Sequence, residues 1–184
     1  MNNEPRQDLA IYEGGDIQIK RPPEVVEFLC WLAGFIDGEG TLAVTKRKPI
    51  PKNRTYHYTY RAYLSISNTN KKTMEYIKEK FEEIFGKEFG VLGEYKLKKE
   101  TYNNQYLLTV AKFDQLIKVL PLITPYLVMK KKQAVLVLEF VNSRILKMNK
   151  KHIGSDISQR EIEIYDDLKK LNKRGNDYAR RYHS

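Results

Sequence analysis

The chain has 184 residues, of which 41% are hydrophobic and 30% are charged, and its formal net charge is +10. This length suffices for one domain with a real core and is short for two. The basic balance favours a polyanionic partner. The single cysteine excludes an intrachain disulfide and predicts a reducing, intracellular compartment, with organelle and prokaryotic cytoplasm left undistinguished. No apolar run is long enough to span a bilayer, so no membrane partner is expected.

The positive charge is concentrated in one window of the chain. Residues 41–74 contain eight lysines and arginines and no acid. Such clustering is the electrostatic footprint of nucleic-acid binding. The eight bases are Lys46, Arg47, Lys48, Lys52, Arg54, Arg61, Lys71 and Lys72.

The chain begins with a polar stretch, residues 1–23, which we interpret as an N-terminal extension. The dipeptide Pro22-Pro23 followed by Glu24 predicts a helix over residues 24–37. We expect Cys30 to be a small apolar residue in a buried helix.

Two strands are predicted next, over residues 41–47 and 55–67. In both, apolar and polar side chains alternate, as in a sheet with one buried face. Leu42 and Val44 mark the apolar face of the first strand, and Ala62, Leu64 and Ile66 mark that of the second. Thr45, Arg47, Arg61, Tyr63 and Ser65 point the other way.

Caps and turns predict the remaining elements, which are a helix, two strands and three more helices. Asn70 and Gly86 bound the first of these helices, and the two strands cover residues 89–99 and 102–112. Asp114 and Pro121 bound a short helix, which a broken helix from about 124 to 148 follows. A capping box of Ser158 and Glu161 begins the last helix. Four antiparallel strands with helices on one face form an α+β architecture. We divide the chain into the extension, a core over 24–148 and a C-terminal helical extension over 149–184.

Residues 32–40 read LAGFIDGEG, an apolar helix end that runs into an acidic, glycine-rich turn. A carboxylate at the end of a buried helix is costly unless it is paired or bound to a cation. Glu39 is therefore a candidate metal ligand. The nine residues resemble the signature of the LAGLIDADG homing endonucleases. That family has the predicted αββαββα order and a saddle-shaped sheet, so the resemblance covers roughly residues 24–148.

The motif occurs once, and the resemblance then implies a homodimer in which two motif helices pack side by side. Ala33, Gly34 and Gly38 keep one edge of the helix small, so two backbones could approach closely. Packing of this helix on its own sheet is the alternative, because that contact also favours small residues.

The resemblance implies metal-dependent hydrolysis of both strands of double-stranded DNA, leaving short 3′ overhangs at a long pseudo-palindromic site. Mg²⁺ or Mn²⁺ would be the cofactor, and Ca²⁺ is expected to bind without supporting cleavage. Glu39 from each subunit would hold the metal, with the Gly38 carbonyl as a further ligand. Asp37 would cap or brace the motif.

Three further positions match the family's active site. Asn68 matches a polar residue near the attacking water, although a turn or cap role is equally consistent with its sequence context. Lys130 matches a basic residue near the phosphate, with the alternative of a solvated helix start and a register uncertain by one residue. Lys72 matches a second basic residue.

The strands of such a sheet would lie along the major groove, which admits a two-stranded ribbon. Residues of the polar face are the candidates for contact, with arginine and glutamine suited to base edges and lysine to phosphates. They are Thr45, Arg47, Arg61, Tyr63, Ser65, Lys96, Lys98 and Gln105.

Two other classes of function are consistent with parts of the sequence. An intron RNA maturase, or a DNA-binding protein that does not cleave, could use the same scaffold, and intron RNA would then be a partner. A ribosomal or structural RNA-binding protein would explain the charge but not the motif.

Overall fold

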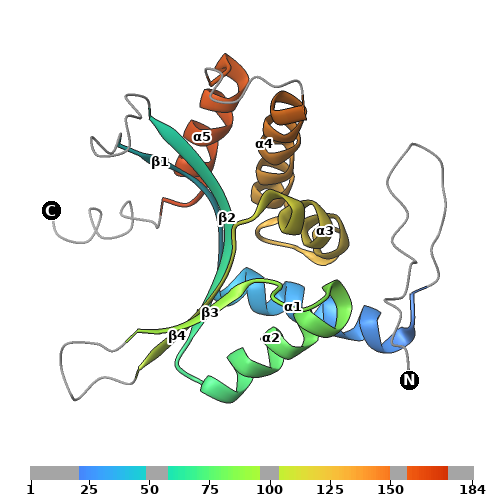
Figure 1. Ribbon diagram of the computed structural model, residues 1–184. Coiled ribbons are helices and arrows are strands. Elements are labelled where there is room, and N and C mark those ends of the chain that lie inside the picture. Colours follow the sequence, from blue (N-terminus) through green and yellow to red (C-terminus); the bar gives the residue numbers. More distant parts are fainter. Residues whose placement is uncertain (1–20, 49–57, 96–103, 150–156, 174–184) are drawn as a thin grey trace, which may run out of the picture.

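The computed structural model describes residues 21–48, 58–95, 104–149 and 157–173. Its elements follow the predicted αββαββα order, continued by further helices (Figure 1). They are α1 (Pro23–Glu39), β1 (Gly40–Arg47), β2 (Thr59–Asn68), α2 (Lys71–Phe85), β3 (Val91–Tyr95), β4 (Gln105–Val110), α3 (Phe113–Ile123), the short 3₁₀ helix η2 (Thr124–Tyr126), α4 (Lys131–Asn149) and α5 (Gln159–Leu171).

The four strands form one antiparallel sheet in the order β1-β2-β4-β3. Figure 1 shows the sheet curving so that its concave side faces away from α1, α2, α3 and α4. The predicted α+β fold with helices on one face is therefore confirmed. None of the described helices is long and apolar enough to cross a membrane.

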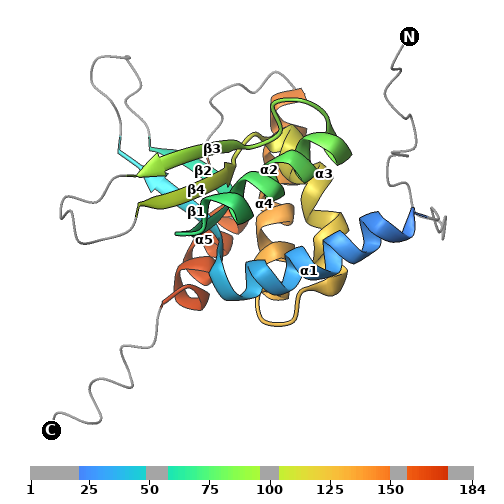
Figure 2. The ribbon, with the colours of Figure 1, turned by 90° about the horizontal axis from the view of Figure 1, so that it is seen from below.

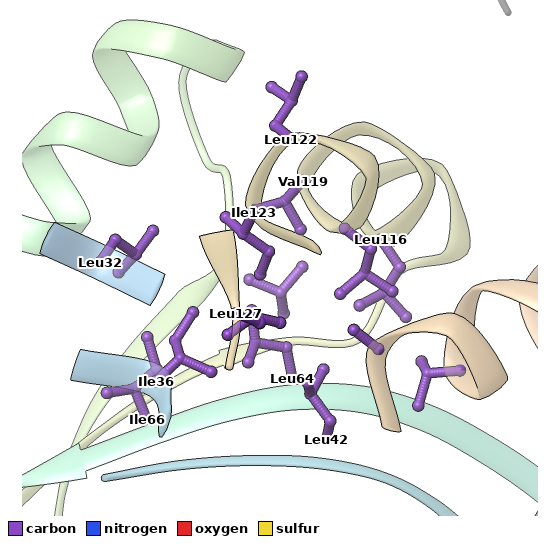
Figure 3. Packing of buried hydrophobic residues seen from close by; sticks show 14 of the residues in the cluster. Leu32, Ile36, Leu42, Leu64, Ile66, Leu116, Val119, Leu122, Ile123 and Leu127 are labelled. Atoms are coloured by element: carbon purple, nitrogen blue, oxygen red, sulfur yellow. The ribbon is translucent and has the colours of Figure 1, made fainter. Parts of the chain in front are cut away.

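The core lies between the sheet and the helices (Figure 3). The alternation of β1 and β2 is confirmed, because Leu42, Leu64 and Ile66 are at most 1% exposed. Helix α1 contributes Leu32 and Ile36 to the same cluster, together with residues of α3. Most apolar side chains on the helix-facing side of the sheet are thus buried in the core, and the concave side is the face of the sheet that stays open to a partner.

Most of the predicted caps are confirmed. The Asn70 side chain accepts from the Thr73 N–H, and Gly86 ends α2 with φ +99°, a conformation that favours glycine. The short helix was predicted less well. Lys112, not Asp114, is its N-cap residue, and Pro121 lies inside the helix instead of ending it.

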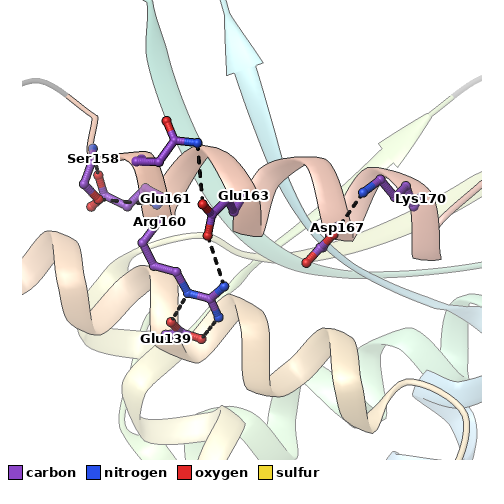
Figure 4. Close-up of polar contacts among 8 residues, drawn as sticks. Glu139, Ser158, Arg160, Glu161, Glu163, Asp167 and Lys170 are labelled. Atoms are coloured by element: carbon purple, nitrogen blue, oxygen red, sulfur yellow. Dashed lines mark hydrogen bonds and ion pairs between the residues drawn. The ribbon is translucent and has the colours of Figure 1, made fainter.

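Helix α5 flanks the sheet at β1, where Figure 2 shows it beside the edge of the strands. The Asn172 side chain donates to the Leu42 carbonyl at 2.8 Å, which satisfies a polar group of this edge strand. Arg160 and Glu139 form an ion pair that links α5 to α4 (Figure 4). The described part of the C-terminal extension is therefore packed onto the core.

A buried carboxylate holds the start of α5. Glu161 is 0% exposed and forms the predicted capping box with Ser158. It also accepts from Ser143 Oγ at 2.9 Å and Lys147 Nζ at 2.7 Å. Burial alone would raise the pKa of Glu161, but these donors hold that pKa below its ordinary value.

Candidate active site and nucleic-acid interface

The motif lies in the second half of α1, which divides into an inner and an outer side. The inner side is buried and includes Leu32, Ile36 and Asp37. The outer side is exposed and includes Gly34, Gly38 and Glu39. Figure 2 shows α1 running along the border of the helical layer and leading directly into β1. The helix extends two residues beyond the predicted end at 37, so that Glu39 belongs to its last turn.

Asp37 is a structural acid that joins α1 to the start of α4. Its carboxylate is 9% exposed and accepts from the backbone N–H groups of Val128, Met129 and Lys130 at 2.8, 3.1 and 2.8 Å. Burial alone would raise the pKa of Asp37, but these three donors and the Lys130 ammonium hold it below its ordinary value. The predicted bracing role is thereby supported by the geometry.

Lys130 also binds the end of α1, with its side chain as the donor. Its ammonium donates to the Ile36 carbonyl at 3.0 Å and to the Asp37 carbonyl. The Ile36 carbonyl also accepts from the Gly40 N–H, whereas the Asp37 carbonyl is among those that an α-helix leaves without internal partners. A cation is also favoured at this end of the helix dipole. Two segments more than 90 residues apart in the sequence therefore meet at the end of the motif helix, and Lys130 lies beside the turn that carries Glu39.

Gly40 sets the direction in which the chain leaves this helix. A Cβ atom at Gly40 would lie 2.7 Å from the Ile36 carbonyl oxygen and 2.8 Å from the Ile36 side chain. Only glycine permits this approach, which lets the chain pass from helix to strand without a loop. Glu39 is thereby held at the junction of α1 and the sheet, with its side chain exposed. The sequence prediction gave Gly40 no such role.

The expected cost of a buried carboxylate does not apply to Glu39, because its side chain is exposed. An exposed carboxylate nevertheless suits a divalent cation that is shared with other ligands. Among the described residues, no group of three or more His, Cys, Asp or Glu side chains could enclose a metal ion. Mg²⁺ usually takes one or two carboxylates and fills its other positions with water and phosphate oxygens. The Gly38 carbonyl is another of the last four of α1 and is a possible further donor. Glu39 and Gly38 therefore fit such a cation only if it is completed from outside this chain.

The other two predicted active-site residues, Asn68 and Lys72, lie on elements other than the motif helix. Asn68 ends β2, and its side-chain oxygen accepts from the Asn70 N–H at 2.8 Å, as the turn reading predicts. Lys72 is exposed in the first turn of α2. In the part of the chain that the structure describes, neither residue forms a hydrogen bond or ion pair with Glu39. Their catalytic roles stay predictions.

The concave side of the sheet, which we call the open face, carries no carboxylate on its described strands. Its residues are Thr41, Ala43, Thr45 and Arg47 on β1, Thr59, Arg61, Tyr63, Ser65 and Ser67 on β2, Val91, Gly93 and Tyr95 on β3, and Gln105, Leu107 and Thr109 on β4. All predicted contact residues within the described ranges lie here, with Arg47, Arg61 and Gln105 exposed. Lys96 and Lys98 lie outside the described residues.

The outer side of α1 is open enough for close packing. A Cβ atom at Gly34 or at Gly38 would have no neighbour within 4 Å. Ala33 was predicted wrongly as an interface residue, because it is 0% exposed and belongs to the core of its own chain. The expectation of a buried Cys30 was also wrong, since this residue is exposed on the outer side. Its place on the helix surface follows from which neighbours cover α1, and the sequence does not reveal these.

Three large apolar side chains near this helix are exposed and were missed. Trp31 is 42% exposed, and it stacks on Phe35 with ring centroids 5.3 Å apart. Val128 and Met129 are 86% and 74% exposed in the turn that Asp37 binds. Adjacent exposed hydrophobic residues of this size often mark a contact surface. A run of apolar residues next to a lysine cluster was the available sequence signal for Val128 and Met129.

The comparisons with known proteins concern the same region. A model of the LAGLIDADG endonuclease family matches residues 32–139. A comparison with curated proteins found no match.

Several solved structures are similar in fold. The archaeal intron-encoded homing endonuclease I-Vdi141I, complexed with DNA, has a TM-score of 0.61 at 19% identity, covering 81% of this chain and 86% of that one. The homing endonuclease I-CvuI, in complex with its target in the presence of Ca, has a TM-score of 0.51 at 22% identity over 80% and 96%. I-SmaMI, bound to uncleaved DNA in the presence of calcium ions, has a TM-score of 0.54 at 24% identity, but this chain covers only 45% of that one.

Proposed function

The chain belongs to the LAGLIDADG endonuclease family, and from this premise we propose that it is a homodimeric, site-specific endonuclease for double-stranded DNA. The observation that carries the proposal is the position of Glu39. An exposed carboxylate projects from the junction of the motif helix and a carboxylate-free sheet face. DNA on that face would bring its phosphates to Glu39 at the border.

The open face supplies the DNA contacts in this proposal. Arg47 and Arg61 suit guanine edges or phosphates, and Gln105 suits adenine. Thr45, Tyr63 and Ser65 add hydrogen-bonding groups between them. The net charge of +10 also favours binding to a polyanion. I-Vdi141I and I-CvuI, which share the fold, are seen with DNA, and we transfer that partner to this chain.

A divalent cation, Mg²⁺ or Mn²⁺, supplies charge neutralisation at the phosphate and a more acidic water. Glu39, with the Gly38 carbonyl, would hold it together with the DNA. Lys130 would keep a positive charge next to the scissile phosphate, and Asn68 and Lys72 would orient water and phosphate oxygens. Cleavage of both strands would leave short 3′ overhangs.

Two subunits are needed in this proposal because one chain carries one motif. The outer side of α1 supplies the contact, since Gly34 and Gly38 admit a second backbone and Trp31 offers apolar area at their side. The exposed turn at Val128 and Met129 extends this surface. This chain covers less than half of I-SmaMI, which is consistent with two such units in that longer chain.

The function is tested by selecting cleavable sites from a randomised, pseudo-palindromic DNA library with Mg²⁺. We expect the wild-type protein to cut one long site and the Glu39→Gln protein to bind that site without cutting it. Binding without cleavage under any divalent metal would reject the nuclease and favour a maturase or a DNA-binding protein. Specific binding of intron RNA would then separate these two.

The dimer is tested on the same preparation. Cys30 is the only cysteine and lies on the outer side of α1, so it is a built-in probe of this contact. A short bismaleimide should link two wild-type subunits through Cys30, and the Cys30→Ser protein should stay unlinked. A monomer in sedimentation at micromolar concentration, with or without DNA, would reject the homodimer.

A further inference from the structure

The open face is divided into two chemically different halves. Its charged residues on the described strands, Arg47 and Arg61, lie at the far end of β1 and β2. The half formed by β3 and β4 has no charged residue on this face in the described part of the chain. Val91 is 69% exposed there and Tyr95 is 57% exposed. Beside Gln105 and Thr109, this half therefore also offers apolar contact, whereas the arginines lie in the other half.

The strand register assembles these apolar groups into one patch. Val91 pairs with Thr109, and Gly93 pairs with Leu107, so these residues share the open face. The ring of Tyr95 leans toward Gly93, since a Cβ atom there would lie 3.7 Å from its Cε2. We call the group of Val91, Tyr95 and Leu107 the apolar patch.

The patch continues directly into the polar part of the face. Thr109 pairs with Val91 on one side and with Ser65 on the other, so a single row crosses from β3 to β2. Any DNA that contacts Ser65 along this row would also meet Val91. Water is a poor neighbour for a valine at 69% exposure on a strand, whereas the major groove offers one apolar group, the C5-methyl of thymine.

We propose that the apolar patch reads thymine C5-methyl groups in each half of the DNA site, with Val91 as the main specificity-determining residue. The inference rests on the proposed function, because it requires DNA on the open face. It adds a division of labour to it, in which Arg47 and Arg61 recognise hydrogen-bonding edges and Val91 recognises methyl groups.

The test uses the full-length protein and the site recovered by selection, with Ca²⁺ in place of Mg²⁺ to measure binding alone. Thymines are replaced by deoxyuridine in blocks of two or three positions, in both half-sites at once. A lost methyl contact costs about 0.8 kcal/mol, so we expect about fourfold weaker binding per half-site and about fifteenfold for the symmetric substitution. Only one block should show this loss.

The Val91→Ser protein identifies the residue responsible, because it removes both methyl groups of valine, whereas threonine would keep one that can contact thymine. We expect it to bind thymine and deoxyuridine versions of that block equally. Val135 is a matched control, since it is an exposed valine on α4, and Val135→Ser should retain the fifteenfold preference.

Each alternative outcome is decisive. A selected site without thymine in any block, or an equal preference for thymine in wild-type and Val91→Ser proteins, would reject methyl reading while leaving the endonuclease intact. Failure to bind any DNA would reject the proposed function itself, and the patch would then be a surface for a protein partner.

Discussion

The inner and outer sides of α1 place two acids of one motif in opposite environments. Asp37 on the inner side is 9% exposed and accepts three backbone N–H groups. Glu39, two residues later, is exposed at the end of the helix. Both are carboxylates in the same nine-residue motif, and the packing around α1 gives them different environments. The fold uses Asp37, whereas Glu39, which we propose binds the metal, stays exposed.

The surroundings of Asp37 explain why the motif tolerates a buried acid. A buried carboxylate is stabilising when backbone donors surround it, as they do at Asp37. Those bonds fix the end of α1 against the start of α4, and Lys130 closes the contact from the other direction. The rigid helix end then fixes where Glu39 points. In the proposed function, the position of Glu39 therefore depends on the contact that Asp37 makes on the inner side.

The largest expected effect is on cleavage. Glu39→Gln should lower the cleavage rate by about 10³-fold or more, the order of effect for a group at the reacting atoms. Stability should change by less than about 0.5 kcal/mol, because Glu39 is an exposed residue. Single-turnover cleavage and urea unfolding measure the two effects. Glu79→Gln, at an exposed position on α2, is the control and should change neither the cleavage rate nor the stability. Equal cleavage by the two variants would show that Glu39 has no catalytic role.

Replacement of Asp37, the acid on the inner side of α1, should instead reduce stability. Asp37→Ala leaves backbone N–H groups without their acceptor and should lower the free energy of unfolding by about 2–4 kcal/mol. Asp37→Asn retains one acceptor oxygen and should lose less. Urea unfolding at pH 7 gives both values, with the exposed Asp166→Ala as the control. If Asp37→Ala were as stable as that control, the contact between Asp37 and the turn before α4 would not contribute to the free energy of unfolding.

The third expected effect separates the monomer from the dimer. Gly34→Leu has room within its own chain but would overpack two helices in contact, at a cost of about 1–3 kcal/mol. The dimer Kd should rise by about 10- to 100-fold, as measured by sedimentation. The unfolding of the monomer should not become easier, since glycine is a poor helix former. Asn142→Leu, on the exposed side of α4, is the control and should leave the dimer Kd unchanged. An unchanged Kd for Gly34→Leu would show that the dimer interface does not include the outer side of α1.

The smallest expected effect is a pH dependence of stability. The pKa values of Asp37 and Glu161 are lowered in the folded chain, so each contributes stability above its unfolded pKa of about 4. That contribution is lost as the pH falls through the folded pKa. Urea midpoints measured from neutral pH downward should therefore drop below about pH 4. Asp37→Asn should show a shallower drop than the wild type, and an equal drop would mean that Asp37 does not contribute.

Much of the fold was predictable because its signals are local. Alternation in β1 and β2 identified the buried face, and Asn70, Gly86 and the capping box at Ser158 marked helix ends. The errors lie where local signals compete. Asp114 is a good capping residue that the chain does not use, and Pro121 is tolerated inside α3.

The candidate site was predictable only in part. The motif identified Glu39 and Asp37 because their order is fixed in nine consecutive residues. Ala33 and Cys30 were misplaced because the small size of a side chain does not say which neighbour covers it. Val128 and Met129 were missed because their exposure depends on a turn held by Asp37 from the far end of the chain.

The family, the order of the elements and the two faces of each strand can be predicted from the sequence alone, since they follow from periodicity and from fixed short patterns. Three features are visible only in the folded chain: Asp37 and Lys130 bind the end of α1 from two directions, α5 covers the edge of β1, and Val91 is exposed on the open face. The reason is physical. Periodicity fixes which side chains share a face, whereas burial and pairing depend on segments that are distant in the sequence and meet only in the folded chain.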